Sequence, residues 1–480
     1  MKENSIKRNA FFNVVYTIVN MVFPLITYPY VTRVLSAVGM GKVSFFSSVS
    51  NYAIMFGSLG ISTYGIRAVA KVRDDEKELS KVTSELFWLN IIITVIVIFF
   101  LIATVPFIDK FSGDFFLLFI NTVVIMSTPF GLNWLYSGLE QYSYITRRNI
   151  FFKTVSLILV FLLVKRNADY LLYAALTAFS TVGACLCNLL YSRKFVKICI
   201  AKSLKFKYHL KPMLLLFASI LAVSVYTNLD TIMLGFINGD REVGLYTVAT
   251  KVKWLLLSAV NAVSAVMLPR LSNYINNKKI DRYNQILKKS VSFIFLVTIP
   301  LAVYFILEAE DSILFLGGEN YKDAIVCMKV LMPILVISGF SNITGNQILI
   351  PQGRDLQFMC ALIIGAIVDV ILNTLLMPCF GCIGAAMATL LAELTQMLIQ
   401  CHYTQNDIRG TVEKNTIFKG IISTFIAAAG VIIFKGIINL NIFLRLFLTA
   451  TVFFSTYGWC LIILKEKNVM EIMGQMRIKY

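Results

Sequence analysis

The sequence contains little charge and almost no histidine. Only 15% of its 480 residues are Asp, Glu, Lys or Arg, two are His, and 58% are hydrophobic. Soluble domains usually carry about 25% charged and about 45–50% apolar residues, and a water-exposed surface could not accommodate this apolar excess. The composition therefore predicts a polytopic membrane protein and excludes a globular enzyme. The formal net charge is +18, but a nucleic-acid-binding module would not carry this apolar content.

Motifs of catalytic sites are also absent from the sequence. The chain has no GxSxG elbow, no phosphate-binding loop ending in Lys-Ser/Thr and no HExxH. Its two histidines, His209 and His402, lie near the ends of apolar stretches. The nine cysteines form no cluster at zinc spacing, so we expect no metal and no cofactor. These absences favour a transporter without its own ATPase over an enzyme.

Fourteen stretches are long and apolar enough to cross a bilayer, which takes about 20 residues of helix. They lie at residues 10–34, 42–64, 86–107, 115–138, 148–164, 168–192, 213–237, 243–269, 290–307, 324–350, 358–377, 382–404, 416–435 and 441–464. Twelve spans are the alternative if two weak stretches are misread. The sequence thus predicts an all-α fold of about 14 transmembrane helices.

The basic residues predict the orientation of these spans. Of the 44 Lys and Arg, 30 lie in the termini and in six loops on one side, and eight lie in or beside the seven opposite loops. Basic loops remain in the cytoplasm, so we expect both termini to be cytoplasmic. The opposite loops are short, which leaves no room outside for a folded catalytic domain.

A long basic connector, residues 193–212, divides the predicted spans into groups. We expect an N-terminal six-helix bundle at 1–207, a second six-helix bundle at 208–404, and a two-helix hairpin with a cytoplasmic tail at 405–480. The matched spacing of spans and basic loops suggests that the two bundles are a repeat, as in many secondary transporters, and that they face a central cavity.

Ionisable side chains inside predicted spans are candidate functional residues, because charge at membrane depth is costly. Asp230 and Lys251 have a similar estimated depth in consecutive spans, where a structural salt bridge and a substrate site are equally good interpretations. Asp369 and Glu393 fall near mid-membrane, which suits a relay for H+ or Na+. Hydrogen bonding between helices by a protonated carboxyl is the alternative for both acids.

Several short motifs resemble a known family in their order and spacing. Residues 23–41, FPLITYPYVTRVLSAVGMG, resemble the first-span signature of the Wzx-type polysaccharide repeat-unit flippases, which belong to the multidrug/oligosaccharidyl-lipid/polysaccharide exporter superfamily. The similarity continues, over most of residues 1–400, at Gly60-Ile61, Tyr64-Gly65, Arg67, Ala70, Asn133-Trp134, Gly138, Glu140, Tyr142, Asp230, Leu234-Gly235, Val243-Gly244-Leu245-Tyr246 and Leu268-Pro269-Arg270-Leu271-Ser272. The last two spans carry no matching motif.

The resemblance implies a flippase that moves an undecaprenyl-pyrophosphate-linked oligosaccharide across the bacterial cytoplasmic membrane by alternating access, for capsule, O-antigen or other surface polysaccharide. A diphosphate needs cationic surroundings on this path. The motif positions make Arg33 and Arg67 the first candidates for binding it, followed by Lys251 and Arg270.

Lys153 and Arg148 form a further candidate pair at the cytoplasmic entry, with snorkelling towards the membrane surface as the structural alternative. A polysaccharide polymerase and a chain-length regulator are the implied protein partners. The rival functions are a cation-coupled multidrug exporter, for which Asp369 and Glu393 would serve, and a lipid II flippase.

Overall fold

The computed structural model describes residues 3–199, 206–437 and 441–478, and it contains no strand in these ranges. The chain divides into two compact units, Met1–Gly235 and Phe236–Tyr480. Each of the fourteen apolar stretches coincides with helical segments, which confirms the prediction of an all-α membrane protein. Within the described residues, eleven helices are long and apolar enough to cross a membrane, so the count of fourteen spans is not confirmed.

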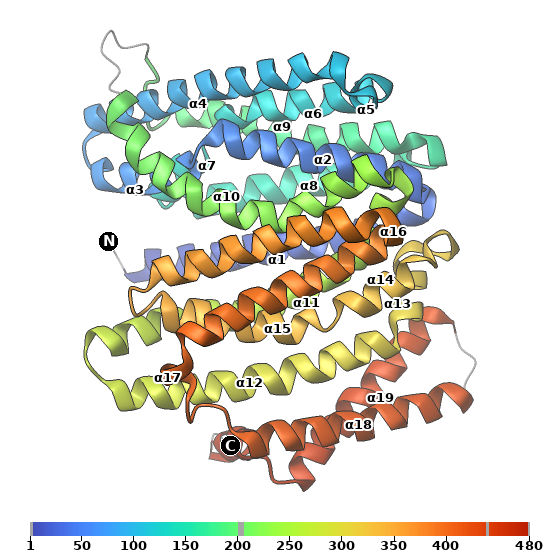
Figure 1. Cartoon of the computed structure of the whole chain (residues 1–480). Coiled ribbons are helices and arrows are strands. Elements are labelled where there is room, and N and C mark those ends of the chain that lie inside the picture. The colour runs from blue at the N-terminus through green and yellow to red at the C-terminus, as the bar shows by residue number, and fades with distance from the viewer. Residues whose placement is uncertain (1–2, 200–205, 438–440, 479–480) are drawn as a thin grey trace. The chain divides into compact units, whose positions relative to one another are not determined.

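The first unit is built from long helices that run side by side, drawn in blue to green in Figure 1. Its elements are α1 (Glu3–Val34), α2 (Ala37–Ser58), α3 (Ile61–Val72), α4 (Glu76–Thr104), η1 (Val105–Phe107), α5 (Asp109–Gly113), α6 (Phe115–Ser127), η2 (Thr128–Gly131), α7 (Asn133–Gly138), α8 (Tyr142–Leu163), η3 (Asn167–Asp169), α9 (Tyr170–Ser192) and α10 (Phe206–Ile237).

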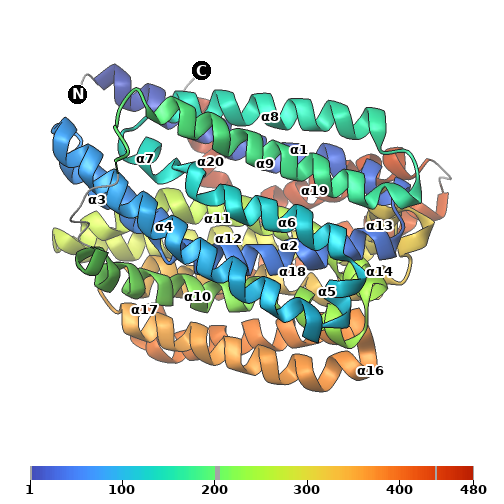
Figure 2. The same ribbon diagram turned by 90° about the horizontal axis from the view of Figure 1, so that it is seen from above.

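The second unit is also helical, and its longest helix is bent back on itself. Its elements are α11 (Asp240–Asn276), α12 (Ile280–Leu307), α13 (Ala309–Gly317), η4 (Glu319–Tyr321), α14 (Ala324–Leu331), α15 (Ile334–Asn342), η5 (Ile343–Leu349), α16 (Asp355–Tyr403), α17 (Gln405–Ile408), α18 (Lys414–Ile437), α19 (Ile442–Ile463) and α20 (Lys467–Ile478). Gly381, with φ +54° and ψ −131°, breaks α16 into two arms. The arms lie side by side (Figure 2), which accounts for two predicted spans in one element.

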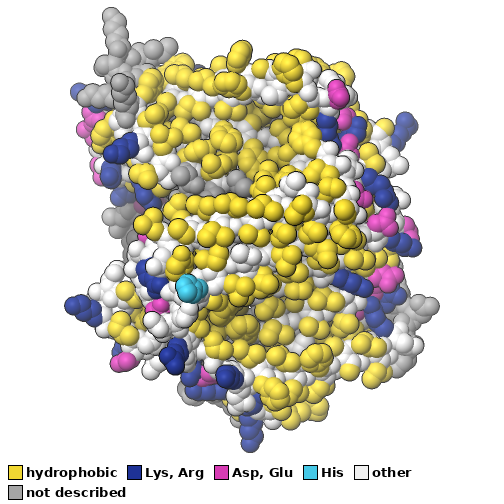
Figure 3. Space-filling view, viewed as in Figure 1, with side chains coloured by type: hydrophobic (Ala, Val, Ile, Leu, Met, Phe, Trp, Pro, Cys, Tyr) yellow, Lys and Arg dark blue, Asp and Glu magenta, His cyan; other side chains and the backbone are white. Residues whose placement is uncertain are grey.

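Hydrophobic side chains remain exposed along the helices of both units. On the face drawn in Figure 3, hydrophobic side chains cover most of the surface, and charged side chains gather towards the edges. Phe99 and Phe100 of α4 and Phe425 of α18 are examples, each more than 60% exposed. Apolar surface on this scale, on helices long enough to cross a bilayer, is what contact with lipid tails requires.

Helix α10 packs within the first unit through three close contacts. Gly60, at φ +82°, lies so near α10 that a Cβ atom there would be 2.7 Å from the Met213 carbonyl oxygen. The Tyr52 hydroxyl donates to the Ser224 carbonyl at 2.9 Å, and Gly235 leaves room for the Phe45 ring. The compact unit therefore extends to Gly235, whereas the boundaries at 207 and 404 remain a prediction about bundles.

The C-terminal hairpin, α18 and α19, is part of the second unit. At one end, Lys435 pairs with Glu308 at 2.8 Å and Arg445 Nε donates to Asp311 Oδ2 at 2.6 Å. Further along α19, the Tyr457 hydroxyl donates to the Leu296 carbonyl of α12 at 2.7 Å. These contacts attach the hairpin to α12 and α13.

Close packing of α3 on α7 positions one end of the first unit. A Cβ atom on Gly65 would lie 2.8 Å from Trp134 Cδ2, and one on Gly138 would lie 2.6 Å from Val69 Cγ1. Both distances are too short for a side chain, so the two helices can touch only because both positions are glycine. Tyr64-Gly65, Asn133-Trp134 and Gly138 of the family resemblance thus meet at one helix contact.

We expect Gly65→Ala to lower stability although alanine favours helix. Overpacking against Trp134 should cost about 1–3 kcal/mol, more than the roughly 0.5–1 kcal/mol by which alanine stabilises a helix. Thermal unfolding of the purified protein in detergent measures the change. Gly430→Ala on α18, where nothing lies within 4 Å of the added Cβ, is the control, and it should unfold at the same temperature or higher. Equal unfolding temperatures for both variants would contradict the packing argument.

Candidate functional site

A cavity of about 960 Å³ opens between α3, α4 and α10 in the first unit. Each helix contributes one face, because residues spaced three, four or seven apart lie on the same side of a helix. On α3 these are Tyr64, Arg67, Ala68 and Lys71. The remaining lining residues are Val72, Glu78, Lys81, Val82, Glu85, Tyr208, His209, Pro212, Leu215 and Leu216.

The rim of this cavity carries more basic than acidic charge. Lys81 pairs with Glu78 one turn away, with Nζ 3.1 Å from Oε1. No acid of the described residues lies within ion-pair distance of Arg67 or Lys71, and both side chains are exposed. Two cations without an acid partner in this part of the chain therefore face the cavity, an arrangement suited to an anionic ligand.

A buried polar cluster forms the inner wall of the same cavity. Glu85 and His209 are only 3% and 2% exposed. The Glu85 Oε2 and His209 Nε2 atoms lie 2.8 Å apart, and the Tyr64 hydroxyl lies 2.8 Å from His209 Nδ1. One side chain from each of the three helices takes part, so the cluster ties α3, α4 and α10 together.

The other basic candidates of the first unit lie elsewhere. Arg148 on α8 donates to Asn188 and, at 3.4 Å, to Asn133 Oδ1. Lys153 donates to Asn20 of α1 at 2.5 Å. Both side chains are half-buried and join α8 to its neighbours, and a part in substrate entry stays a prediction for them.

Four further candidates lie on the three helices α1, α10 and α11. Arg33 is exposed in the last turn of α1, and Asp230 of α10 is 4% exposed. On α11, Lys251 is half-buried and Arg270 is exposed. Of all the basic candidates, Arg67 is the one that the described cavity between α3, α4 and α10 contains.

The two acids predicted near mid-membrane occupy facing arms of α16. Asp369 and Glu393 are 1% and 6% exposed. A Cβ atom on Gly365 would lie 3.2 Å from Cβ of Gln396 on the other arm. Since the arms are antiparallel, Asp369 lies one turn beyond Gly365 and Glu393 about one turn before Gln396, which brings the two acids to a similar level.

A second cavity, of about 610 Å³, lies in the second unit. It is lined by Ile275, Ile280, Tyr283, Asn284, Gln285, Lys288, Gln352, Asn406, Asp407, Arg409, Gly410 and Thr411. Lys288 at its edge pairs with Glu413, with Nζ 3.0 Å from Oε1, and this hydrogen bond lowers the pKa of Glu413. Arg354 is not part of this lining, but it contacts two of the lining residues, Gln352 and Asp407.

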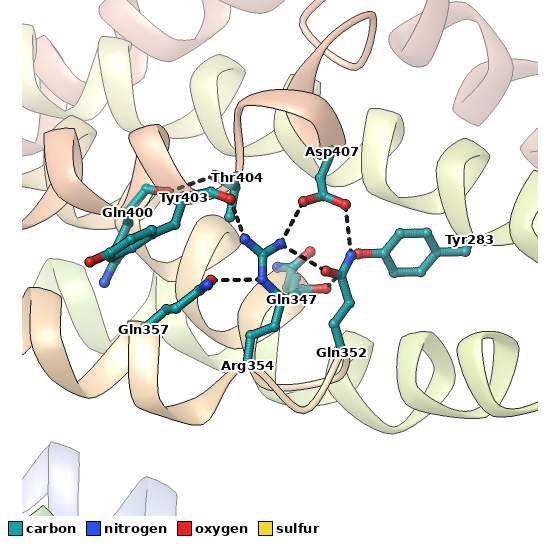
Figure 4. A network of polar contacts seen from close by, with 9 residues as sticks. All are labelled: Tyr283, Gln347, Gln352, Arg354, Gln357, Gln400, Tyr403, Thr404 and Asp407. Atoms are coloured by element: carbon teal, nitrogen blue, oxygen red, sulfur yellow. Dashed lines mark hydrogen bonds and ion pairs between the residues drawn. The ribbon is translucent and has the colours of Figure 1, made fainter.

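Figure 4 shows how completely Arg354 is engaged. Its guanidinium donates to Asp407 Oδ2 at 2.9 Å, to Gln352 Oε1 at 3.0 Å and to Gln357 Oε1 at 2.7 Å, and also to the Tyr403 carbonyl. The network fixes the turn before α16 against the segment that follows it. The contacts of Arg354 are therefore structural.

Comparison with known proteins places these features in a family. A model of the polysaccharide biosynthesis protein family matches residues 6–275, more than half of the chain. The chain belongs to the polysaccharide biosynthesis protein family. A second family model, MatE, matches residues 216–375. The family resemblance expected from the motifs is confirmed.

Relatives of this polysaccharide biosynthesis protein are named for transport. A protein of Escherichia coli (strain K12), named "Putative O-antigen transporter", is 22% identical over 411 residues, covering 84% of this chain and 97% of its own length. The solved structure of the lipid II flippase MurJ in an inward closed conformation superposes with a TM-score of 0.75 at 14% identity, covering 97% of this chain and all of that chain.

An inward-facing multidrug resistance transporter of the MATE family has a TM-score of 0.66 at 14% identity, covering 83% of this chain and 94% of its own. At these identities the solved structures show the fold. The name of the Escherichia coli relative describes transport, in agreement with the expectation that this chain is not an enzyme.

Lys71, Lys81, Glu85 and His209 line the cavity between α3, α4 and α10, and none of them was a sequence candidate. A signal for three of them is present in the sequence. Tyr64, Arg67 and Lys71 are spaced i, i+3, i+7, and so are Glu78, Lys81 and Glu85, which places each trio on one helix face. His209 follows more than 100 residues later, and no local pattern links it to Glu85.

We expect Arg354→Ala to destabilise the second unit by about 1.5–3 kcal/mol, because several charge-assisted hydrogen bonds disappear and Asp407 loses its cation. Arg354→Lys should recover only part of this loss, since an ammonium cannot reproduce the guanidinium fork. Thermal unfolding measures both variants, with Arg409→Ala, an exposed arginine of the second cavity, as the control. An Arg354→Ala protein as stable as the control would show that the network contributes little.

Proposed function

We propose that the chain is a flippase for oligosaccharide repeat units linked to undecaprenyl pyrophosphate, which it moves across the bacterial cytoplasmic membrane by alternating access. Membership of the polysaccharide biosynthesis protein family and the transporter names of its relatives support this function. The basic cavity between α3, α4 and α10 is the observation on which the proposal depends. Surface polysaccharide assembly, with a polymerase and a chain-length regulator, is the pathway that we infer.

The cavity supplies what a diphosphate headgroup needs. A doubly charged anion binds most strongly where cations are not already neutralised by acids, and Arg67 and Lys71 meet this condition among the described residues. Lys71, Lys81 and His209 of the cavity lining belong to the basic sequence segments 65–85 and 193–212. By the positive-inside rule we infer that the mouth of the cavity, and both termini, are on the cytoplasmic side. The headgroup would thus enter from the leaflet where the glycan is assembled, with its polyprenyl tail in lipid.

A cation-coupled exporter is the alternative that Asp369 and Glu393 favour. Both acids are buried at a similar level of the two α16 arms, and buried carboxyls in transporters commonly mark ion pathways. Ion coupling is also compatible with a flippase, so the substrate separates the two functions.

We expect Arg67→Ala and Lys71→Ala each to weaken binding of a diphosphate headgroup by about tenfold or more, because a charge-assisted contact is lost. Cells that carry either variant in place of the native protein should display less surface glycan, at unchanged amounts of protein in the membrane. Lys77→Ala, an exposed lysine of α4 outside the cavity lining, should keep native levels of glycan. Native glycan levels in both cavity variants would exclude this cavity as the headgroup site.

Asp369→Asn and Glu393→Gln test the ion-coupling role. If either acid couples transport to a gradient, flipping in proteoliposomes should slow when an H+ or Na+ gradient is collapsed, and the variant should be insensitive to the gradient. The readout is the fraction of a fluorescent lipid-linked glycan that becomes accessible from the opposite leaflet. Equal native rates with and without each gradient would assign both acids to structure.

A further inference from the structure

The buried pair of Glu85 and His209 is a titratable group in the wall of the cavity between α3, α4 and α10. Both side chains are almost fully buried, and their Oε2 and Nε2 atoms are 2.8 Å apart. Histidine is the side chain whose charge ordinarily changes between about pH 5 and pH 8. A change in the charge of this pair would act directly on the cavity that it lines.

The geometry accommodates the pair with and without an additional proton. In the neutral imidazole, Nε2–H donates to Glu85 and Nδ1 accepts from the Tyr64 hydroxyl. In the imidazolium, both nitrogens carry hydrogen, so Nδ1–H donates to the Tyr64 oxygen instead. Because a phenol hydroxyl can donate or accept, the 2.8 Å contact of Tyr64 with His209 is satisfied in either state.

The two states differ by one unit of charge inside the cavity. An ionised Glu85 beside a neutral His209 contributes one negative charge, and uptake of a proton by His209 makes the pair neutral overall. The other titratable or charged side chains of the described residues that line the cavity are Arg67 and Lys71 from α3, Glu78 and Lys81 from α4, and Tyr208 from α10. Since Glu78 and Lys81 pair with each other, the proton shifts the balance towards Arg67 and Lys71.

We propose that Glu85 and His209 form a proton-binding site, and that proton uptake by this pair raises the affinity of the cavity for a diphosphate. This inference rests on the proposed function, which supplies the diphosphate as the ligand. By linkage, binding of the diphosphate takes up a proton to the same extent. The cavity therefore binds H+ and the headgroup cooperatively, on the side of the membrane that the basic loops face.

The test is calorimetric titration of the full-length protein in detergent with a short-chain prenyl diphospho-sugar. Both phosphates of this probe are ester-linked, so its own charge is constant from about pH 5.5 to pH 8. We expect its affinity to fall at least about tenfold between about pH 5.5 and pH 7.5, because the cavity loses one positive charge near a dianion. Titrations in buffers of different ionisation enthalpy should show net proton uptake on binding.

The chain offers a matched control, because it has one other histidine. His209→Gln, which keeps a hydrogen-bonding side chain without the titration, should bind the probe equally at both pH values and take up no proton. His402→Gln, an exposed residue of the second unit, should retain the native pH dependence. Should His209→Gln fail to fold, Glu85→Gln removes the carboxylate of the pair, and it should likewise flatten the profile.

Three results would overturn the inference. They are pH-independent affinity without proton uptake in the native protein, native pH dependence in His209→Gln, and native pH dependence in Glu85→Gln. A native protein that binds the probe equally at every pH leaves the headgroup site of the proposed function intact. A native protein that binds no probe at any pH excludes the headgroup site and this inference together.

Discussion

The contact of Gly65 with Trp134 is the constraint on which the basic cavity depends. The absence of a side chain at Gly65, and at Gly138 against Val69, lets α3 lie directly on α7. With that face of α3 occupied, Tyr64, Arg67 and Lys71 face the cavity. A third glycine, Gly60, lets α10 approach the start of α3, which brings His209 to Tyr64. The position of the polar residues in the cavity thus depends on close backbone packing at Gly60, Gly65 and Gly138. The family motifs at these glycines are therefore needed for helix contact.

Charge pairing separates the structural cations of this chain from the cations proposed to bind the headgroup. The Arg354 guanidinium donates hydrogen bonds to Asp407, two glutamines and a carbonyl group (Figure 4). Arg445 and Lys435 pair with buried acids and so attach the C-terminal hairpin. A cation already compensated in this way has little electrostatic energy left for a ligand. Arg67 and Lys71 differ, because no described acid lies within ion-pair distance of either. Because only 15% of the residues are charged, two neighbouring cations without a described acid partner at one cavity are unusual in this chain.

The sequence predicted the parts of this structure that depend on local physics. A bilayer requires about 20 apolar residues of helix, so the positions of the helices followed from composition alone, even where Gly381 makes two arms from one element. Arg67 was found through a motif. Glu85 and His209 were missed because their contact joins residues 124 apart in sequence, and only the packing of α10 onto α3 and α4 brings them together. Arg148 was a candidate because its charge could be recognised in the sequence. Its hydrogen-bond partners could not be predicted, because the two asparagines lie 15 and 40 residues away.

The inner wall and the rim of the cavity differ in how their charged groups are stabilised. Removing an acid and a base from water is costly unless their hydrogen-bonding groups are satisfied, and both ring nitrogens of His209 meet a partner. These two hydrogen bonds make the wall a junction of three helices. Displacing any one helix would leave a buried polar group without its hydrogen-bond partner. Arg67 and Lys71 at the rim are exposed, so an anion can reach them without disturbing the junction. The proposed proton uptake would therefore change the charge of the wall while both hydrogen bonds of His209 are kept.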